Sequence, residues 1–217
     1  MRIGVLGTGT VGKTIATKLV ELGHDVTMGS RSAESEALLE WVQGAGASAK
    51  GGTFADAASS AELVFNCTAG GASLDALATA GVENLAGKVL VDVANPLDFS
   101  QGMPPTLSVC NDDSLGERIQ AAFPETKVVK ALNTVNARVM VDPGRVSGDH
   151  HLFLCGNDEA AKSDVAALLE GFGWPSGSII DLGGISAARG MEMYLPLWLR
   201  LMGALGTPDF NIGVHKA

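Results

Sequence analysis

A glycine-rich hexapeptide near the N-terminus constrains the fold of this chain more than any other feature of its sequence. Gly7-Thr8-Gly9-Thr10-Val11-Gly12 follows an apolar run, Arg2–Leu6, and opens Val11–Leu22, whose apolar residues recur with helical spacing. A G-x-G-x-x-G between a strand and a helix is typical of the first turn of a Rossmann-type βαβ unit. The first glycine permits the tight turn, the second leaves room for a pyrophosphate, and the third lets the helix approach the sheet. We therefore predict that this turn binds the phosphates of a dinucleotide.

The end of the second predicted strand, Asp25–Met28, indicates which dinucleotide is bound. Enzymes that use NAD usually carry Asp or Glu at the end of this strand, where the carboxylate binds the ribose 2′-hydroxyl. Here Gly29-Ser30-Arg31 follows the strand, and Asp25 lies too early to serve. Ser30 and Arg31 can bind a 2′-phosphate through a hydroxyl and a planar guanidinium. The sequence therefore predicts NADP as the cofactor, with a solvated loop arginine as the alternative interpretation.

Predicted strands and helices alternate through the first two-thirds of the chain, as expected of a parallel sheet with helices on both faces. Further strands are expected within Ala45–Gly52 and at Leu63–Cys67, Lys88–Val93, Lys127–Ala131, Leu152–Cys155 and Ser178–Asp181. Helices are expected at Ser35–Gln43, Thr53–Ser60, Ser73–Ala80, Asp113–Phe123, Glu159–Phe172 and Ser186–Leu205, and a loop at Leu97–Pro105. We predict an α/β fold: a Rossmann-type doubly wound parallel sheet with a small C-terminal α/β extension packed on it. Residues 1–130 would form the NADP-binding domain, and residues 131–217 the part for the second substrate and for dimerisation.

Composition and charge limit the possible binding partners of the protein and the cellular compartment in which it is expected. A net charge of −9 argues against binding to nucleic acid. The three cysteines, Cys67, Cys110 and Cys155, are odd in number and form no C-x-x-C, so neither a disulfide framework nor a zinc site is expected. His150-His151 suggests metal binding, but neighbouring strand residues point to opposite faces, and we predict no metal site. No signal peptide or long apolar span is visible, which predicts a cytoplasmic protein without membrane association.

Several blocks of this sequence resemble the NADPH-dependent reductases of the deazaflavin coenzyme F420. The blocks are Met1–Lys13, Gly29–Arg31, Val128–Thr134, Leu154–Glu159, and Asp181–Gly184 continuing to Asn211–Gly213. The resemblance implies a homodimer, with NADP along the carboxyl ends of the strands and a second ring-bearing substrate against the C-terminal part. It implies that NADP is held by Thr8, Gly9, Thr10, Val11, Ser30 and Arg31. It further implies that Thr68, Ala69 and Asn95 line the nicotinamide, and that Asn133 and Ala137 face the second substrate.

The expected reaction is hydride transfer between NADPH and a deazaflavin (F420) or flavin-type acceptor. No acid/base pair stands out, which suits a reaction in which the protein supplies orientation and excludes water. Asn133 is the candidate for orienting the second substrate, because its amide offers a donor and an acceptor. Ala131-Leu132-Asn133-Thr134 also resembles the cytosolic NADPH domain of membrane metalloreductases, so a ferric or flavin reductase stays open. So do a reductase of another small electrophile and a non-catalytic NADPH-binding redox sensor.

The predicted last helix carries more apolar surface than a small domain easily covers. Its apolar residues are Leu195, Leu197, Trp198, Leu201 and Met202. We therefore predict a homodimer in which this helix takes part.

Overall fold

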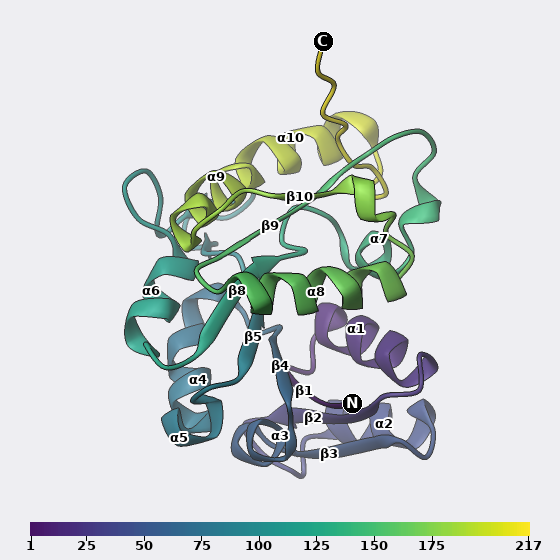
Figure 1. Cartoon of the computed structure of the whole chain (residues 1–217), viewed down its shortest axis with the longest axis vertical. Helices are drawn as coiled ribbons and strands as arrows, with labels where there is room; N and C mark the ends of the chain where they lie inside the picture. Colours follow the sequence, from purple (N-terminus) through teal and green to yellow (C-terminus); the bar gives the residue numbers. More distant parts are fainter.

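A sheet of eight strands runs through the molecule and carries helices on both faces (Figure 1). The computed structural model describes all of residues 1–217. The strand order is β10-β9-β8-β5-β4-β1-β2-β3, and the run from β8 to β3 is parallel throughout. The strands are β1 (Arg2–Leu6), β2 (Asp25–Ser30), β3 (Ala49–Thr53), β4 (Leu63–Asn66), β5 (Val89–Asp92), β8 (Lys127–Ala131), β9 (Leu152–Gly156) and β10 (Ile179–Asp181). The strand order reverses at β1 and β4, as in a Rossmann-type fold, so the predicted α/β class is confirmed.

The two faces of the sheet are buried in two separate hydrophobic cores. Val5 belongs to a cluster of 27 buried residues and the next residue, Leu6, to a cluster of 20, as the strand pleat requires. The first cluster is covered by α1 (Thr10–Glu21), α2 (Glu36–Ala45), α7 (Ala137–Val141) and α8 (Glu159–Gly171). The second is covered by α3 (Phe54–Ser60), α4 (Ser73–Ala80), α5 (Val82–Leu85), α6 (Leu115–Ala122) and α9 (Ala188–Met193). Short 3-10 turns lie at η1 (Gly70–Ala72), η2 (Pro143–Arg145), η3 (Ser176–Ser178) and η4 (Ile185–Ala187).

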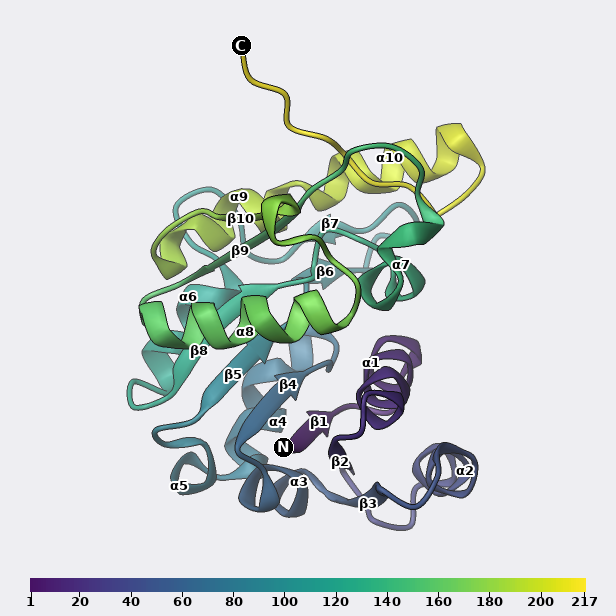
Figure 2. The same cartoon turned by 45° about the vertical axis from the view of Figure 1, so that its right-hand side comes forward.

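The C-terminal part adds two strands to the edge of the same sheet. β9 is antiparallel to β8, with Leu154 opposite Ala131, and β10 is parallel to β9. The segment between β8 and β9 contains α7, which packs on α1 (Figure 2). The chain therefore turns back at the carboxyl end of β8, and this places the residues after β8 beside the glycine-rich turn.

The prediction of one long final helix over Ser186–Leu205 is wrong. The segment is divided into α9 and α10 (Leu195–Leu205), which meet at Tyr194. Pro196 has no backbone N–H to donate to the preceding turn, and this explains the interruption. Both views place α10 at the end of the molecule opposite β3, and only Leu195 of this helix is buried. No helix of the protein, α10 included, has the length and apolar character needed to cross a bilayer.

The segment Leu97–Pro105, predicted as a loop, is also more ordered than expected. It begins with β6 (Leu97–Asp98), which pairs antiparallel with β7 (Thr106–Leu107). A strand of two residues leaves no periodic pattern in the sequence, so the hairpin could not be recognised.

Candidate active site

The three glycines of the turn between β1 and α1 face different constraints. Gly7 has a φ of +116°, which side chains rarely adopt, and a Cβ there would lie 2.7 Å from the carbonyl oxygen of Cys67. A Cβ on Gly12 would collide with the carbonyl oxygen of Gly7, so only glycine lets α1 start this close to β1. A Cβ on Gly9 would meet no protein atom within 4 Å. The second glycine therefore faces open space, which leaves room for a phosphate group.

The N-terminus of α1 directs free hydrogen-bond donors toward this open space. Gly9 is the N-cap residue, it supplies no side-chain cap, and the first turn contains no acidic residue. The first N–H groups of a helix have no partner within it, and together with the helix dipole they attract an anion. This end of α1 therefore fits a pyrophosphate.

A first cavity of about 640 Å³ opens beside the turn, at the carboxyl ends of β1, β2 and β4. It brings together seven of the residues predicted to bind NADP: Gly7, Thr8, Gly9, Ser30, Arg31, Thr68 and Ala69. Its other walls come from β2–α2, α3, β4 and α4: Ser32, Ser35, Phe54, Cys67, Ala72, Asp75, Ala76 and Thr79. Thr10 and Gly12, in the first turn of α1, do not line this cavity.

Ser30 and Arg31 differ in how free they are to bind a phosphate. Ser30 is buried, and its hydroxyl donates to the carbonyl oxygen of Ser32 and accepts from the backbone N–H of Ser32 at 3.2 Å. Arg31 is exposed on the wall of the first cavity and takes part in none of the ion pairs of the structure. Ser30 thus shapes the turn, whereas the guanidinium of Arg31 is the group available to an anion.

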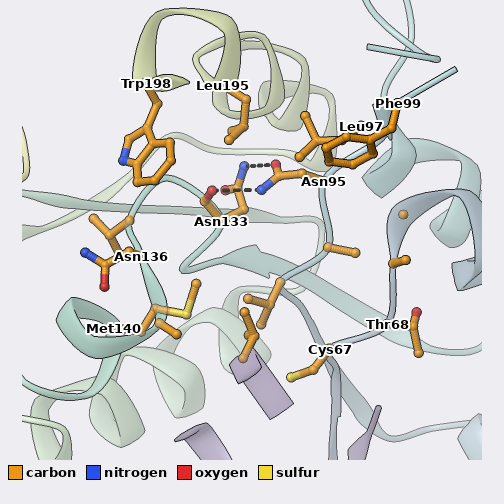
Figure 3. A pocket seen from close by; sticks show the side chains of 17 residues that line it. Cys67, Thr68, Asn95, Leu97, Phe99, Asn133, Asn136, Met140, Leu195 and Trp198 are labelled. Atoms are coloured by element: carbon orange, nitrogen blue, oxygen red, sulfur yellow. Dashed lines mark hydrogen bonds between the residues drawn. The ribbon is translucent and has the colours of Figure 1, made fainter. Parts of the chain in front are cut away.

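A second cavity of about 350 Å³ adjoins the first, and the two share the wall formed by residues 67–69. Figure 3 shows the side chains that line this second cavity, with Cys67 and Thr68 labelled among them. Twelve of its 17 lining residues are hydrophobic. Besides Thr68 and Ala69, four of the predicted site residues lie on it: Val11, Asn95, Asn133 and Ala137. The remaining walls come from the ends of β4 and β5, the β6 hairpin, the segment after β8, and α10: Gly70, Val93, Ala94, Leu97, Phe99, Val135, Asn136, Met140, Leu195 and Trp198, with Cys67, Thr68 and Ala69.

Asn133 and Asn95 form a reciprocal amide pair on the wall of the second cavity (Figure 3). The Nδ2 of Asn133 donates to Oδ1 of Asn95 at 2.9 Å and to the carbonyl oxygen of Met191 at 3.1 Å. The Nδ2 of Asn95 donates to the carbonyl oxygen of Asn133 at 2.9 Å. These bonds use the donors of Asn133, but its Oδ1 is buried and has no hydrogen-bond partner. An unpaired buried acceptor is costly, so this oxygen fits a ligand that supplies a donor.

Trp198 brings a second unpaired polar atom to the same cavity. Its Nε1 is buried and has no acceptor in the structure. The indole ring stacks on Phe210, with ring centroids 5.4 Å apart. The segment that carries Phe210 is in turn attached to α7, since Asn136 donates to the carbonyl oxygen of Pro208 and to Asp209. Two residues on the wall of the second cavity therefore each carry a buried polar atom without a partner: an acceptor on Asn133, after β8, and a donor on Trp198, in α10.

The structure contains a buried ion cluster that the sequence did not reveal. The Nζ of Lys130 lies 2.7 Å from Oδ2 of Asp92 and 2.8 Å from Oε1 of Glu192, and all three side chains are excluded from solvent. Burial alone would lower the pKa of Lys130, but the two carboxylates outweigh it and raise this pKa. A lysine inside an apolar strand, Val128-Val129-Lys130-Ala131, was the only signal in the sequence, since its partners lie far along the chain.

Cys67 lies where the two cavities meet, but it is a poor nucleophile. Burial and the nearby charge of Asp92 raise the pKa of its thiol well above the usual range. His150 is engaged with its surroundings: Nε2 lies 3.1 Å from the carbonyl oxygen of Pro143 and Nδ1 lies 3.0 Å from Nδ2 of Asn211. No group of three or more His, Cys, Asp or Glu side chains is arranged to hold a metal ion.

Comparisons of the sequence find relatives of two kinds. Residues 2–96 match the sequence family described as NADP oxidoreductase, coenzyme F420-dependent. The F420-dependent NADP reductase of Methanothermobacter marburgensis is 31% identical over 212 residues, which cover 93% of this chain and 92% of the relative. Metalloreductase STEAP3 of Rattus norvegicus is 31% identical over 204 residues, which cover 91% of this chain. The matched region is only 38% of the length of this second relative.

Comparisons of the structure agree with those of the sequence. A candidate F420-dependent NADP reductase from Arthrobacter sp. FB24 superimposes over the whole of both chains with a TM-score of 0.94 and 55% identity. A reductive aminase from Aspergillus terreus in complex with NADPH superimposes on 94% of this chain and 62% of its own, with a TM-score of 0.68 and 18% identity. At this low identity the second likeness shows a shared fold.

Proposed function

Because the chain belongs to the family of F420-dependent NADP oxidoreductases, we propose that it transfers a hydride between NADPH and a deazaflavin (F420) or flavin-type ring. The observation that carries this proposal is the pair of adjoining cavities. One is built on a phosphate-binding turn, and the other is apolar with two unpaired polar atoms on its wall. Two ring-bearing substrates placed in them would meet at the wall formed by residues 67–69.

The first cavity would hold NADPH, which supplies the hydride. The open space at Gly9 and the donors at the N-terminus of α1 fit the pyrophosphate. The free guanidinium of Arg31 fits the 2′-phosphate, and the hydrogen bonds between Ser30 and Ser32 hold the backbone turn that carries Arg31. Thr68 and Ala69 line both cavities, which supports their role beside the nicotinamide.

The second cavity would hold the ring that accepts the hydride. Its apolar walls would keep water away from the reacting carbons, so that a hydride moves directly between the two rings. The reduced acceptor then takes up one proton from solvent. Oδ1 of Asn133 would accept a hydrogen bond from a ring N–H, and Nε1 of Trp198 would donate one to a ring carbonyl. These residues orient the acceptor, and they do not exchange protons with it.

A screen of acceptors tests this proposal. Oxidation of NADPH would be followed anaerobically with deazaflavin, FMN, a quinone and a ferric chelate, each against an enzyme-free control. The proposal expects the deazaflavin or FMN to be reduced much faster than the control. If neither ring is reduced faster than the control, hydride transfer to a flavin-type ring is wrong.

A second candidate function is the reduction of ferric iron through a flavin. The relative named metalloreductase, 31% identical over 91% of this chain, favours it. In this case the ferric chelate would be reduced only when NADPH and catalytic amounts of flavin are both present. Reduction of deazaflavin without any stimulation of ferric reduction would exclude this candidate.

A further inference from the structure

The buried ion cluster Asp92–Lys130–Glu192 uses every donor of its lysine. Besides the two carboxylates, Nζ of Lys130 donates to the carbonyl oxygen of Ala94. Asp92 ends β5, Lys130 lies in β8 and Glu192 lies in α9, so the cluster joins two parts of the chain far apart in sequence. The three side chains are at most 1% exposed, so no solvent screens their interactions.

On its N-terminal side the cluster reaches the wall shared by the two cavities. Oδ1 of Asp92 accepts from Nδ2 of Asn66 at 2.8 Å. Oδ1 of Asn66 accepts from the hydroxyl of Thr68 at 2.6 Å, and Thr68 lines both cavities. Ala94, bonded to Lys130, precedes Asn95 on the wall of the second cavity. The residues expected beside the nicotinamide are thus linked to Lys130 indirectly: Thr68 through Asn66 and Asp92, and Asn95 through its chain neighbour Ala94.

On its C-terminal side the cluster fixes the position of α9. The carboxylate of Glu192 accepts from the backbone N–H groups of Leu115 and Gly116 at 2.8 and 3.0 Å, at the N-terminus of α6. The adjacent residue, Met191, supplies the carbonyl oxygen that accepts from Nδ2 of Asn133. The position of α9 therefore sets the direction in which the free Oδ1 of Asn133 points.

The backbone before Asn133 requires such support. Leu132 is fully buried and has a φ of +66°, a left-handed conformation that is costly for a bulky residue. Such a conformation persists only where the surroundings fix it, and it is found most often at functional sites. The surroundings here are Lys130, two residues earlier, and the amide pair of Asn133 with Asn95.

We propose that Lys130 is a positioning residue for hydride transfer: it fixes the nicotinamide wall (Thr68, Ala94–Asn95) relative to the acceptor-binding oxygen of Asn133. Folding alone does not require charges here, because buried ion clusters can often be replaced by uncharged side chains of similar shape without loss of stability. Small errors in the relative position of two reacting rings are costly, and a displacement of about 1 Å can slow a reaction about 100-fold. This inference rests on the proposed function.

The test compares variants that keep or remove the cluster. Lys130→Met alone leaves two buried carboxylates without a counter-charge and can fail to fold. The variant for the test is therefore the uncharged triple replacement Asp92→Asn, Lys130→Met and Glu192→Gln. Lys162→Met is the matched control, because Lys162 is also a nearly buried lysine bonded to two carboxylates, at 2.8 and 2.7 Å, and it lines neither cavity.

Turnover, the dissociation constant of NADPH and the isotope effect with 4-deuterated NADPH are measured for each variant with the best acceptor of the wild-type protein. We expect the folded triple variant to bind NADPH nearly as the wild type does. Its turnover should fall about 100-fold, with a larger isotope effect, because poor positioning makes the hydride step limiting. Lys162→Met should change none of these. If the triple variant folds and has the turnover of the wild type, the inference is wrong. If the wild-type protein reduces no ring, the proposed function itself is wrong.

Discussion

Replacement of Arg31 by Ala tests the cofactor assignment quantitatively. The guanidinium is exposed and forms no ion pair, so its removal should cost the fold little, and the loss should fall on the ligand. Hydrogen bonds to a charged group contribute about 1.5–3 kcal/mol. Since about 1.4 kcal/mol corresponds to a factor of ten, NADPH should bind about 10- to 150-fold more weakly. NADH has no 2′-phosphate, and its affinity should hardly change.

The assay is a titration of each variant with NADPH and with NADH at two salt concentrations. The loss for NADPH should be smaller at high salt, because an exposed charge pair is screened. Ser30 cannot take over the role of Arg31, because its hydroxyl is engaged with Ser32. Arg118→Ala is the control, since Arg118 is an exposed arginine paired with Asp113 at 2.7 Å and lines neither cavity. An equal loss for both dinucleotides, or no loss for NADPH, would refute the assignment of the 2′-phosphate to Arg31.

Three further predictions concern the turn, the second cavity and the assembly. Gly9→Val should leave the protein folded, because a Cβ at this position meets no protein atom within 4 Å, but should abolish binding of NADPH and NADH; retained titration would mean that the phosphates lie elsewhere. Asn133→Ala should lower turnover with the ring acceptor while NADPH affinity stays nearly intact, and a selective loss of NADPH affinity would contradict the assigned role. We propose that the protein is a homodimer through α10, where Leu197 is 56% exposed. Leu197→Glu should then halve the mass measured by light scattering, and a wild-type protein that is already monomeric at micromolar concentration would disprove the dimer.

The sequence predicted the first half of the fold well because its signals there are local. In the hexapeptide Gly7–Gly12, each glycine is needed either for the backbone conformation, for close packing of α1, or for space beside the turn. The apolar strands around this turn are buried on both faces of the sheet. Ser30 and Arg31 could be placed at the end of β2 because the signals for this strand are also local. The strand extends two residues further than predicted.

The features of the fold and of the site that the sequence did not predict depend on contacts between distant segments. The antiparallel direction of β9 follows from the path of the chain after β8, which leaves no pattern in the residues of β9 itself. The amide pair of Asn95 with Asn133 joins residues 38 positions apart, and the ion pair of Lys130 with Glu192 joins more distant residues still. The left-handed φ of Leu132 is also set by tertiary contacts, because leucine gives no local signal for it. The hydrogen bonds of Ser30 with Ser32 likewise emerged only from the structure.

The proposed function requires that a hydride pass directly from NADPH in the first cavity to a ring in the second. The most direct test is an anaerobic reaction of the wild-type protein with NADPH deuterated at C4, on each face in turn, and with deazaflavin as the acceptor. We predict that, for one of the two faces, the deuterium is recovered on the carbon of the reduced deazaflavin ring. Recovery of the label in water, or its retention on the nicotinamide for both faces, would contradict direct transfer.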